Sequence, residues 1–396
     1  MAPRGSEEKV FSYGILVMTL THVFIHIFDG MLPSLLPLFK EEFGLTLSQL
    51  GIIASMPFLG QAILSIPSGY ISDRLGAKTM IASAFTISIT SALVVSAAPN
   101  ILVLIIALST LGLVSTLYHP ASFAYTSRIV SKHNQSKALG LNNAGGTLGF
   151  ALGPLSLPII IGVLALGWRT AYLAWILPCI LALITVLRLK PEKETSQEGD
   201  QDTLAQPVPN NLRTMFGAGL VFFLVFTAVR AMGIEMIITF LPTYLSEVRM
   251  LRVADASLMY GSVSLLSVIG SPLGGLLSDR FKPKTWLAAS SALATALLMV
   301  AYLAPSAPLF IGFYFAQSFM VSLGIAANSA MIASLTPTAR RGMGYALYFL
   351  PISLIGAATP AFGGIVAERM GLATLFPLAA MFSIISLLIL HFCVKA

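Results

Sequence analysis

The sequence contains little charge and little cysteine. Only 10% of its 396 residues are Asp, Glu, Lys or Arg, whereas about a quarter of the residues are charged in an ordinary soluble domain. The two cysteines, Cys179 and Cys393, both lie in apolar segments and indicate no disulfide framework. P-loop, GxSxG and zinc-type Cys or His motifs are absent, which argues against ATP hydrolysis and most other hydrolytic chemistry. We therefore expect neither an enzyme nor a cofactor or metal site.

Apolar residues are correspondingly abundant. They make up 56% of the chain, whose mean hydropathy is +0.87. A membrane-spanning helix needs about 20 apolar residues, and continuous runs of this kind, rich in Leu, Ile, Ala and Gly, are typical of helices rather than of barrel strands. We predict an all-α integral membrane protein with 12 transmembrane helices, at residues 12–39, 48–70, 78–98, 100–126, 137–164, 169–188, 214–244, 256–277, 285–304, 307–335, 342–366 and 372–393.

Basic residues distinguish the two ends of these helices. Of the 23 Lys and Arg residues, 17 fall on the side that carries the N-terminus, and positive charge is enriched in cytoplasmic loops. Both termini are therefore expected in the cytoplasm, in a multi-pass protein of a bacterial or archaeal cell membrane. The formal charge of +7 then reflects membrane insertion, so we expect membrane lipids but no nucleic acid as partners. Nothing in the sequence requires more than a monomer.

One long hydrophilic stretch divides the chain. Residues 190–212, beginning KPEKETSQEGDQ, are expected to form a flexible cytoplasmic linker between six-helix bundles at residues 1–189 and 213–396. The halves repeat one another, because GYISDRLGAK in the first returns as GGLLSDRFKPK in the second. The offset of 206 residues between these segments also relates Asp29 to Glu235. An acidic residue inside a predicted span is thus itself duplicated.

The duplicated loop resembles the signature of the Major Facilitator Superfamily, and the resemblance covers essentially the whole chain. It implies two pseudo-symmetric six-helix bundles around a central cavity that opens alternately to either side of the membrane. In the resembled family the loop acid stabilises the outward-facing state. The resemblance therefore implies a gating role for four residues of the two loops: Asp73, Arg74, Asp279 and Arg280.

Three further segments are similar to efflux carriers of the fosmidomycin-resistance group in this superfamily. They are HVFIHIFDGMLPSLLPLFKEEFGLTLSQLG at residues 22–51, YHPAS at residues 118–122 and NNAGGTLGFALGP at residues 142–154. This narrower resemblance implies export of a small molecule.

Polar groups form a strip inside the first predicted span. His22, His26 and Asp29 fall on one face of a helix, which must point at protein or water because an ionised carboxylate facing lipid costs several kcal/mol. Carboxyl and imidazole groups in such a setting are able to exchange protons near neutral pH. We expect Asp29 or Glu235 to bind protons or substrate, with a purely structural ion pair as the alternative. For each histidine the alternative is packing, with a hydrogen bond to a backbone carbonyl.

Two more residues join this candidate site. Arg230 lies about 140° from Glu235 around the same predicted helix, so we expect it to pair with Asp29 or with an anionic substrate. His119 precedes Pro120 in the fourth span, which lines the cavity in the resembled family. The expected substrate- and proton-binding residues are thus Asp29, Glu235, Arg230, His22, His26 and His119.

Small residues recur in the fifth predicted span. Gly145, Gly149 and Gly153 are spaced by four residues and precede Pro154, so they form a ridge without side chains on which another helix can lie closely. The pattern partly matches the antiporter motif of drug exporters in the resembled superfamily.

These observations favour a secondary active transporter, namely a proton-coupled antiporter that exports a small polar, amphipathic or anionic compound. The same residue types also suit a proton-coupled uptake symporter of a small organic anion. A third reading is a membrane receptor or lipid-handling protein with a carrier fold.

Overall fold

The computed structural model describes residues 12–131, 134–189, 217–336 and 341–394; for residues 65, 66, 69, 70, 72, 73, 136 and 341–353 among them it describes the backbone alone. The fold is all-helical, with no strand in these ranges. The first helices along the chain are α1 (Tyr13–Phe43), α2 (Leu47–Ser96), α3 (Ile101–Ile129), α4 (Gln135–Leu157), the π-helical turn η1 (Pro158–Val163) and α5 (Trp168–Leu187). The later ones are α7 (Ala218–Glu247), α8 (Val253–Phe281), α9 (Pro283–Leu303), α10 (Ala307–Leu323), α11 (Ile325–Leu335), α12 (Arg341–Met370), the 3-10 turn η4 (Leu372–Thr374) and α13 (Leu375–Phe392).

Eleven helical segments of the described chain are long and apolar enough to cross a membrane. They coincide, within a few residues, with eleven of the predicted spans, so the chain is a multi-pass membrane protein. The twelfth predicted span, residues 342–366, falls on α12, where only part of the side chains is described. The count of 12 and the cytoplasmic location of the termini therefore stay predictions.

The chain forms two compact units. The first contains Met1–Glu192, Thr239–Val268 and Pro360–Glu368, and the second contains Lys193–Ile238, Ile269–Thr359 and Arg369–Ala396. Three helices, α7, α8 and α12, each contribute to both. The division into bundles at residues 1–189 and 213–396 stays a prediction, and the predicted linker at 190–212 lies outside the described residues.

Local sequence determines where the helices of the first unit begin and end. Gly44 adopts the left-handed conformation, with φ of 61°, and ends α1, while Thr46 and Gln49 form a capping box at the start of α2. The predicted spans 48–70 and 78–98 both fall on α2, which contains two spanning segments joined across a kink at Gly76 (φ 74°, ψ 157°). Polar residues such as Arg74 have ordinary helix propensity, so only the glycine interrupts the backbone.

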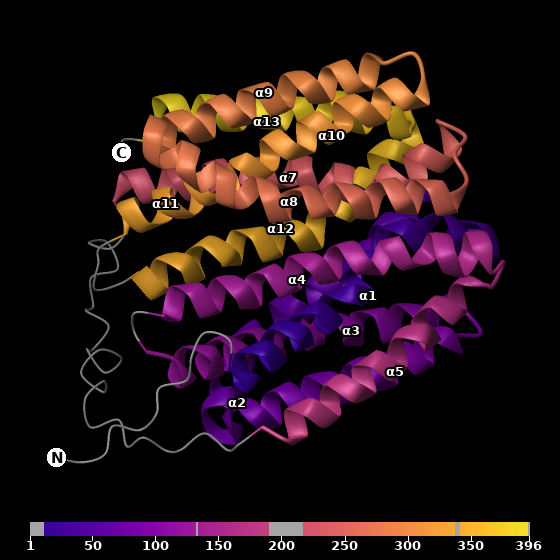
Figure 1. Cartoon of the computed structure of the whole chain (residues 1–396). Helices are drawn as coiled ribbons and strands as arrows, with labels where there is room; N and C mark the ends of the chain where they lie inside the picture. The colour runs from indigo at the N-terminus through magenta and orange to yellow at the C-terminus, as the bar shows by residue number, and fades with distance from the viewer. Residues whose placement is uncertain (1–11, 132–133, 190–216, 337–340, 395–396) are drawn as a thin grey trace. The chain divides into compact units, whose positions relative to one another are not determined.

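Helices α1 and α4 pack against each other through the glycines of α4 (Figure 1). A Cβ atom at Gly145, Gly149 or Gly153 would collide with a backbone carbonyl oxygen of α1, those of Thr19, Val23 and Ile27 respectively. The two backbones are thus in direct contact over more than two helical turns. This close approach brings the polar strip of α1 against α4.

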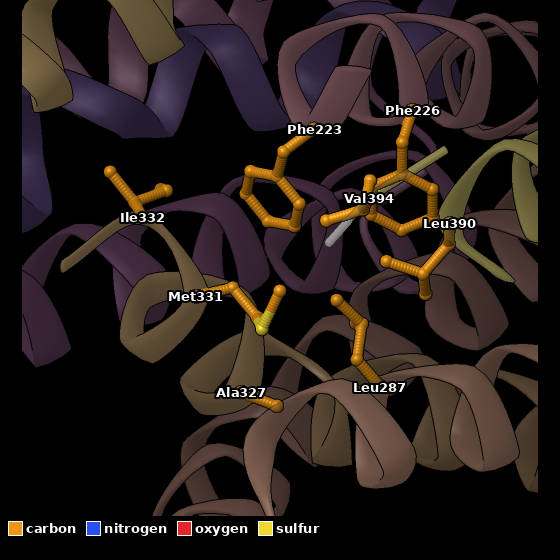
Figure 2. Close-up of a cluster of buried hydrophobic side chains, with 8 residues drawn as sticks. All are labelled: Phe223, Phe226, Leu287, Ala327, Met331, Ile332, Leu390 and Val394. Atoms are coloured by element: carbon orange, nitrogen blue, oxygen red, sulfur yellow. The ribbon is translucent and has the colours of Figure 1, made fainter. Parts of the chain in front are cut away.

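The second unit has its own apolar core, in which α7, α9, α11 and α13 meet. Figure 2 shows the side chains of these helices converging from several directions, with two aromatic rings of α7 on one side of the cluster. The buried members are Phe223, Phe226, Leu287, Ala327, Met331, Ile332, Leu390 and Val394. This packing anchors the N-terminal half of α7, the helix that carries Arg230 and Glu235.

Candidate functional site

The polar strip of α1 is buried inside the first unit. His22 and His26 are only 3% and 7% exposed, and the side chain of Asp29 is 18% exposed. The strip therefore faces protein, as the sequence predicts, and its partners come from α3 and α4.

Asp29 accepts two hydrogen bonds. Its Oδ2 atom lies 3.0 Å from Nδ1 of His26, three residues earlier on α1, and 3.4 Å from the hydroxyl of Ser115 on α3. A carboxylate inside an apolar helix is stabilised by such donors. The contact between His26 and Asp29 thus lies within α1, and the hydroxyl of Ser115 links Asp29 to α3.

His22 is held from the opposite direction, by α4. Its Nδ1 atom lies 2.7 Å from the backbone oxygen of Asn142 and 3.1 Å from the side-chain oxygen of the same residue. The amide nitrogen of Asn142 in turn donates to the hydroxyl of Ser122 on α3, at 2.9 Å. This backbone bond was the packing alternative considered for the histidines, and here it fixes the orientation of the His22 ring.

His119 on α3 completes a group of three imidazoles that we call the histidine cluster: His22, His26 and His119. The ring centroids lie 5.0 Å apart for His22 and His26, and 5.1 Å apart for each of these with His119. Two phenylalanine rings flank the cluster. Phe123 stacks on His119 at 5.7 Å, and Phe150 stacks on His26 at 4.4 Å.

Tyr118, the residue before His119, fixes α3 against α1. Its hydroxyl donates to the backbone oxygen of Met18 at 2.9 Å and lies 2.8 Å from the hydroxyl of Thr21. The segments YHPAS and NNAGG thus meet the first helix at one place, because Tyr118, His119 and Asn142 all contact its polar strip. Ser122 holds the side chain of Asn142 from α3. Ser115, Ser122 and Asn142 were not predicted as site residues, although the i, i+4 spacing of Tyr118 and Ser122 on one helical face was a usable signal for Ser122.

The remaining candidates lie in the second unit. Arg230 and Glu235 are on α7, both partly buried, and the backbone of α7 approaches α13 closely at Gly233, where a Cβ atom would lie 2.8 Å from the carbonyl oxygen of Ala379. Because Asp29 belongs to the first unit, a pairing between Arg230 and Asp29 stays a prediction.

The predicted gating residues lie on α2 and α8, which contain the two copies of the duplicated motif. Arg74 is exposed on α2, and Asp279 and Arg280 are exposed in the last turn of α8. The side chain of Asp73 lies outside the described atoms. Their gating role stays a prediction.

Several curated relatives align with much of the chain. The probable sulfoacetate transporter of Cupriavidus necator is 25% identical over 90% of this chain and 83% of its own length. The probable nitrate transporter of Staphylococcus haemolyticus is 24% identical, over 92% of this chain and 87% of its own. The fosmidomycin resistance protein of Escherichia coli is 23% identical, over 69% and 67%.

Solved structures share the fold. A bacterial homolog of the human lysosomal transporter Spinster, in an inward-facing and occupied conformation, aligns over 98% of this chain and 97% of its own with a TM-score of 0.84 and 17% identity. A D-xylose–proton symporter aligns over 96% and 97% with a TM-score of 0.77 and 18% identity. At the level of sequence, the pattern of the Major Facilitator Superfamily matches residues 18–290 and 223–395. The chain therefore belongs to the Major Facilitator Superfamily of transporters, as its duplicated loop motif indicates.

Proposed function

We propose that the protein is a proton-coupled antiporter that exports a small polar or amphipathic compound by alternating access. The observation that carries the proposal is the duplicated acid within the spanning helices, Asp29 in α1 and Glu235 in α7. Their surroundings differ. Asp29 accepts hydrogen bonds from His26 and Ser115, whereas Glu235 has no hydrogen-bond or ion-pair partner within the described part of the chain.

We assign the exchanged proton to Glu235. A carboxyl group without a partner inside an apolar helix is more stable in its uncharged form, with the proton bound, than as an anion. A substrate that presents donor groups to this carboxylate takes the place of the proton, so that proton and substrate exclude one another. Alternating access to the two sides of the membrane then converts this competition into exchange.

Asp29 has a different role in this proposal. Its carboxylate already accepts hydrogen bonds from His26 and Ser115, so we assign it to shaping the site rather than to carrying the proton. Arg230, five residues before Glu235 on α7, supplies a positive charge for any anionic group of the compound.

Export is supported by the names of several relatives. Besides the fosmidomycin resistance protein, they include a nitrite extrusion protein of Bacillus subtilis, which is 26% identical over 64% of this chain. We further propose that the protein lies in a bacterial cell membrane as a monomer, with both termini in the cytoplasm.

A second candidate is proton-coupled uptake of a small anion. Relatives are named as probable transporters of sulfoacetate and of nitrate, which are anions. If an anion binds Arg230, a proton on Glu235 favours its binding by removing a nearby negative charge. Proton and substrate then move together, which is symport.

A transport measurement in liposomes distinguishes the two candidates without knowledge of protein orientation. Purified protein is reconstituted, a pH gradient is imposed, and accumulation of fosmidomycin, sulfoacetate or nitrate is followed. Antiport predicts accumulation when the lumen is acidic, and symport predicts it when the external medium is acidic. Glu235→Gln should abolish either response, while Asp255→Asn, an exposed carboxylate paired with Arg252, serves as the matched control. Accumulation that is insensitive to the gradient contradicts both candidates.

A further inference from the structure

The histidine cluster contains three nitrogen ligands in close proximity. One ring nitrogen from each of His22, His26 and His119 lies within 4.8 Å of the other two. Around a tetrahedral zinc ion with metal–nitrogen bonds of about 2.0 Å, ligand nitrogens are about 3.3 Å apart. The three nitrogens are thus close to the spacing that such an ion requires.

The hydrogen bonds of two rings determine which nitrogen is available. Nδ1 of His22 lies against the backbone oxygen of Asn142, and Nδ1 of His26 lies against Oδ2 of Asp29. Because a carbonyl or carboxylate oxygen only accepts, each Nδ1 carries the hydrogen in the neutral ring and each Nε2 presents a lone pair. Metal-binding histidines in proteins are almost always held in this way, with one nitrogen donating to an oxygen and the other on the metal.

Unpaired polar atoms are a second and independent observation. Nε2 of His22 and Nδ1 of His119 are both buried, and neither has a hydrogen-bond partner in the part of the chain that the structure describes. Buried polar atoms are usually satisfied, so a pair of orphaned nitrogens in one cluster points to a missing ligand. Phe123 and Phe150 stack on two of the rings, so apolar side chains flank the cluster.

We propose that His22, His26 and His119 bind one divalent transition-metal ion of the zinc or cobalt type. Imidazole nitrogens favour these ions, whereas calcium and magnesium require oxygen ligands. Three protein ligands leave a fourth position for water or a small anion. Asp29 and Asn142 are positioning residues, because they orient the rings of His26 and His22. The inference goes beyond the proposed function and does not depend on the direction or coupling of transport.

A Co²⁺ titration in detergent tests the site directly. Tag-free protein is stripped of metal with a chelator, and the visible absorption of Co²⁺ is recorded on titration, followed by displacement with Zn²⁺. The expected result is one Co²⁺ per chain with the absorption bands of tetrahedral nitrogen coordination. His22→Ala, His26→Ala and His119→Ala should each weaken binding at least tenfold, and His391→Ala, an exposed histidine of α13, should leave it unchanged.

A conservative variant keeps the test valid if an alanine variant does not fold. His119→Cys replaces one ligand by another, so it should retain one Co²⁺ per chain and add the near-ultraviolet absorption of a thiolate–cobalt bond. Gel filtration and the metal-free melting temperature confirm that each variant is folded. The proposal is overturned if the wild type binds no Co²⁺, if folded alanine variants bind as tightly as the wild type, or if His119→Cys lacks the thiolate signature. None of these readouts depends on a proton gradient, so failure here leaves the proposed function untouched.

Discussion

The imidazole rings of His22 on α1 and His119 on α3 lie 5.1 Å apart, centroid to centroid. This contact exists because α3 and α4 both hold α1 in place. Tyr118 bonds α3 to the backbone of Met18, and the glycines of α4 let that helix lie directly on the backbone of α1. The chemistry of the cluster is therefore sensitive to helix packing at positions that carry no functional group.

Gly149→Ala should destabilise the protein. The new Cβ atom would collide with the backbone oxygen of Val23 and crowd His26, so α4 must move away from α1. Overpacking of this kind costs about 1–3 kcal/mol. Thermal unfolding in detergent measures the loss. Gly140→Ala is the matched control on the same helix, because a Cβ atom there has no neighbour within 4 Å and should stabilise the helix by about 0.5–1 kcal/mol. Equal melting temperatures for the two variants would contradict the packing account.

Gly146→Ala should weaken metal binding more than it weakens the fold. A Cβ atom at this position would lie 2.8 Å from Nε2 of His22, the nitrogen assigned to the metal. The ring is the end of a side chain and can turn away, but its bond to Asn142 is then strained. We expect Co²⁺ affinity to fall about tenfold, as for changes in groups that orient a metal ligand. Unchanged affinity, with Gly140→Ala measured beside it, would show that Nε2 is not the ligand atom.

Asn142→Ala separates the two bonds that this residue makes to His22. The substitution removes the side-chain oxygen and the donor to Ser122, while the backbone oxygen 2.7 Å from Nδ1 remains. A buried hydroxyl that loses its partner costs about 1–3 kcal/mol. We therefore expect a lower melting temperature but a change in Co²⁺ affinity of less than tenfold. Loss of binding as complete as in His22→Ala would mean that the side chain, not the backbone, orients the ring.

The helices were predictable from the sequence because each long apolar run corresponds to one membrane-spanning helix. Eleven spans were confirmed in the described chain to within a few residues. The conformation of the connection at residues 71–77 was not predictable in the same way, since polarity marks the membrane boundary and does not determine backbone conformation. There the positive φ of Gly76 is the only break in an otherwise helical segment.

The candidate site was predictable only within one helix. The periodicity of α1 places His22, His26 and Asp29 on one face, and the structure confirms that this face is buried. The rotation of α3 and α4 about their own axes depends on tertiary packing, so the approach of His119 and the bonds from Asn142 and Ser115 could not be derived from spacing. For the same reason the absence of a zinc-type sequence motif led to the expectation of no metal site, whereas the three histidines converge from two separate helices.

The most direct test of proton-coupled exchange is the proton released when a compound binds. Fosmidomycin, sulfoacetate and nitrate are added to purified protein in weakly buffered detergent with a pH-sensitive dye, and binding is followed in parallel by the shift in melting temperature. Antiport predicts that a compound that binds releases protons from the wild type, from Asp29→Asn and from the control Asp255→Asn, and that Glu235→Gln releases none, whereas symport of an anion predicts proton uptake. Binding to the wild type without proton release, or release that persists in Glu235→Gln, would contradict the assignment of the exchanged proton to Glu235.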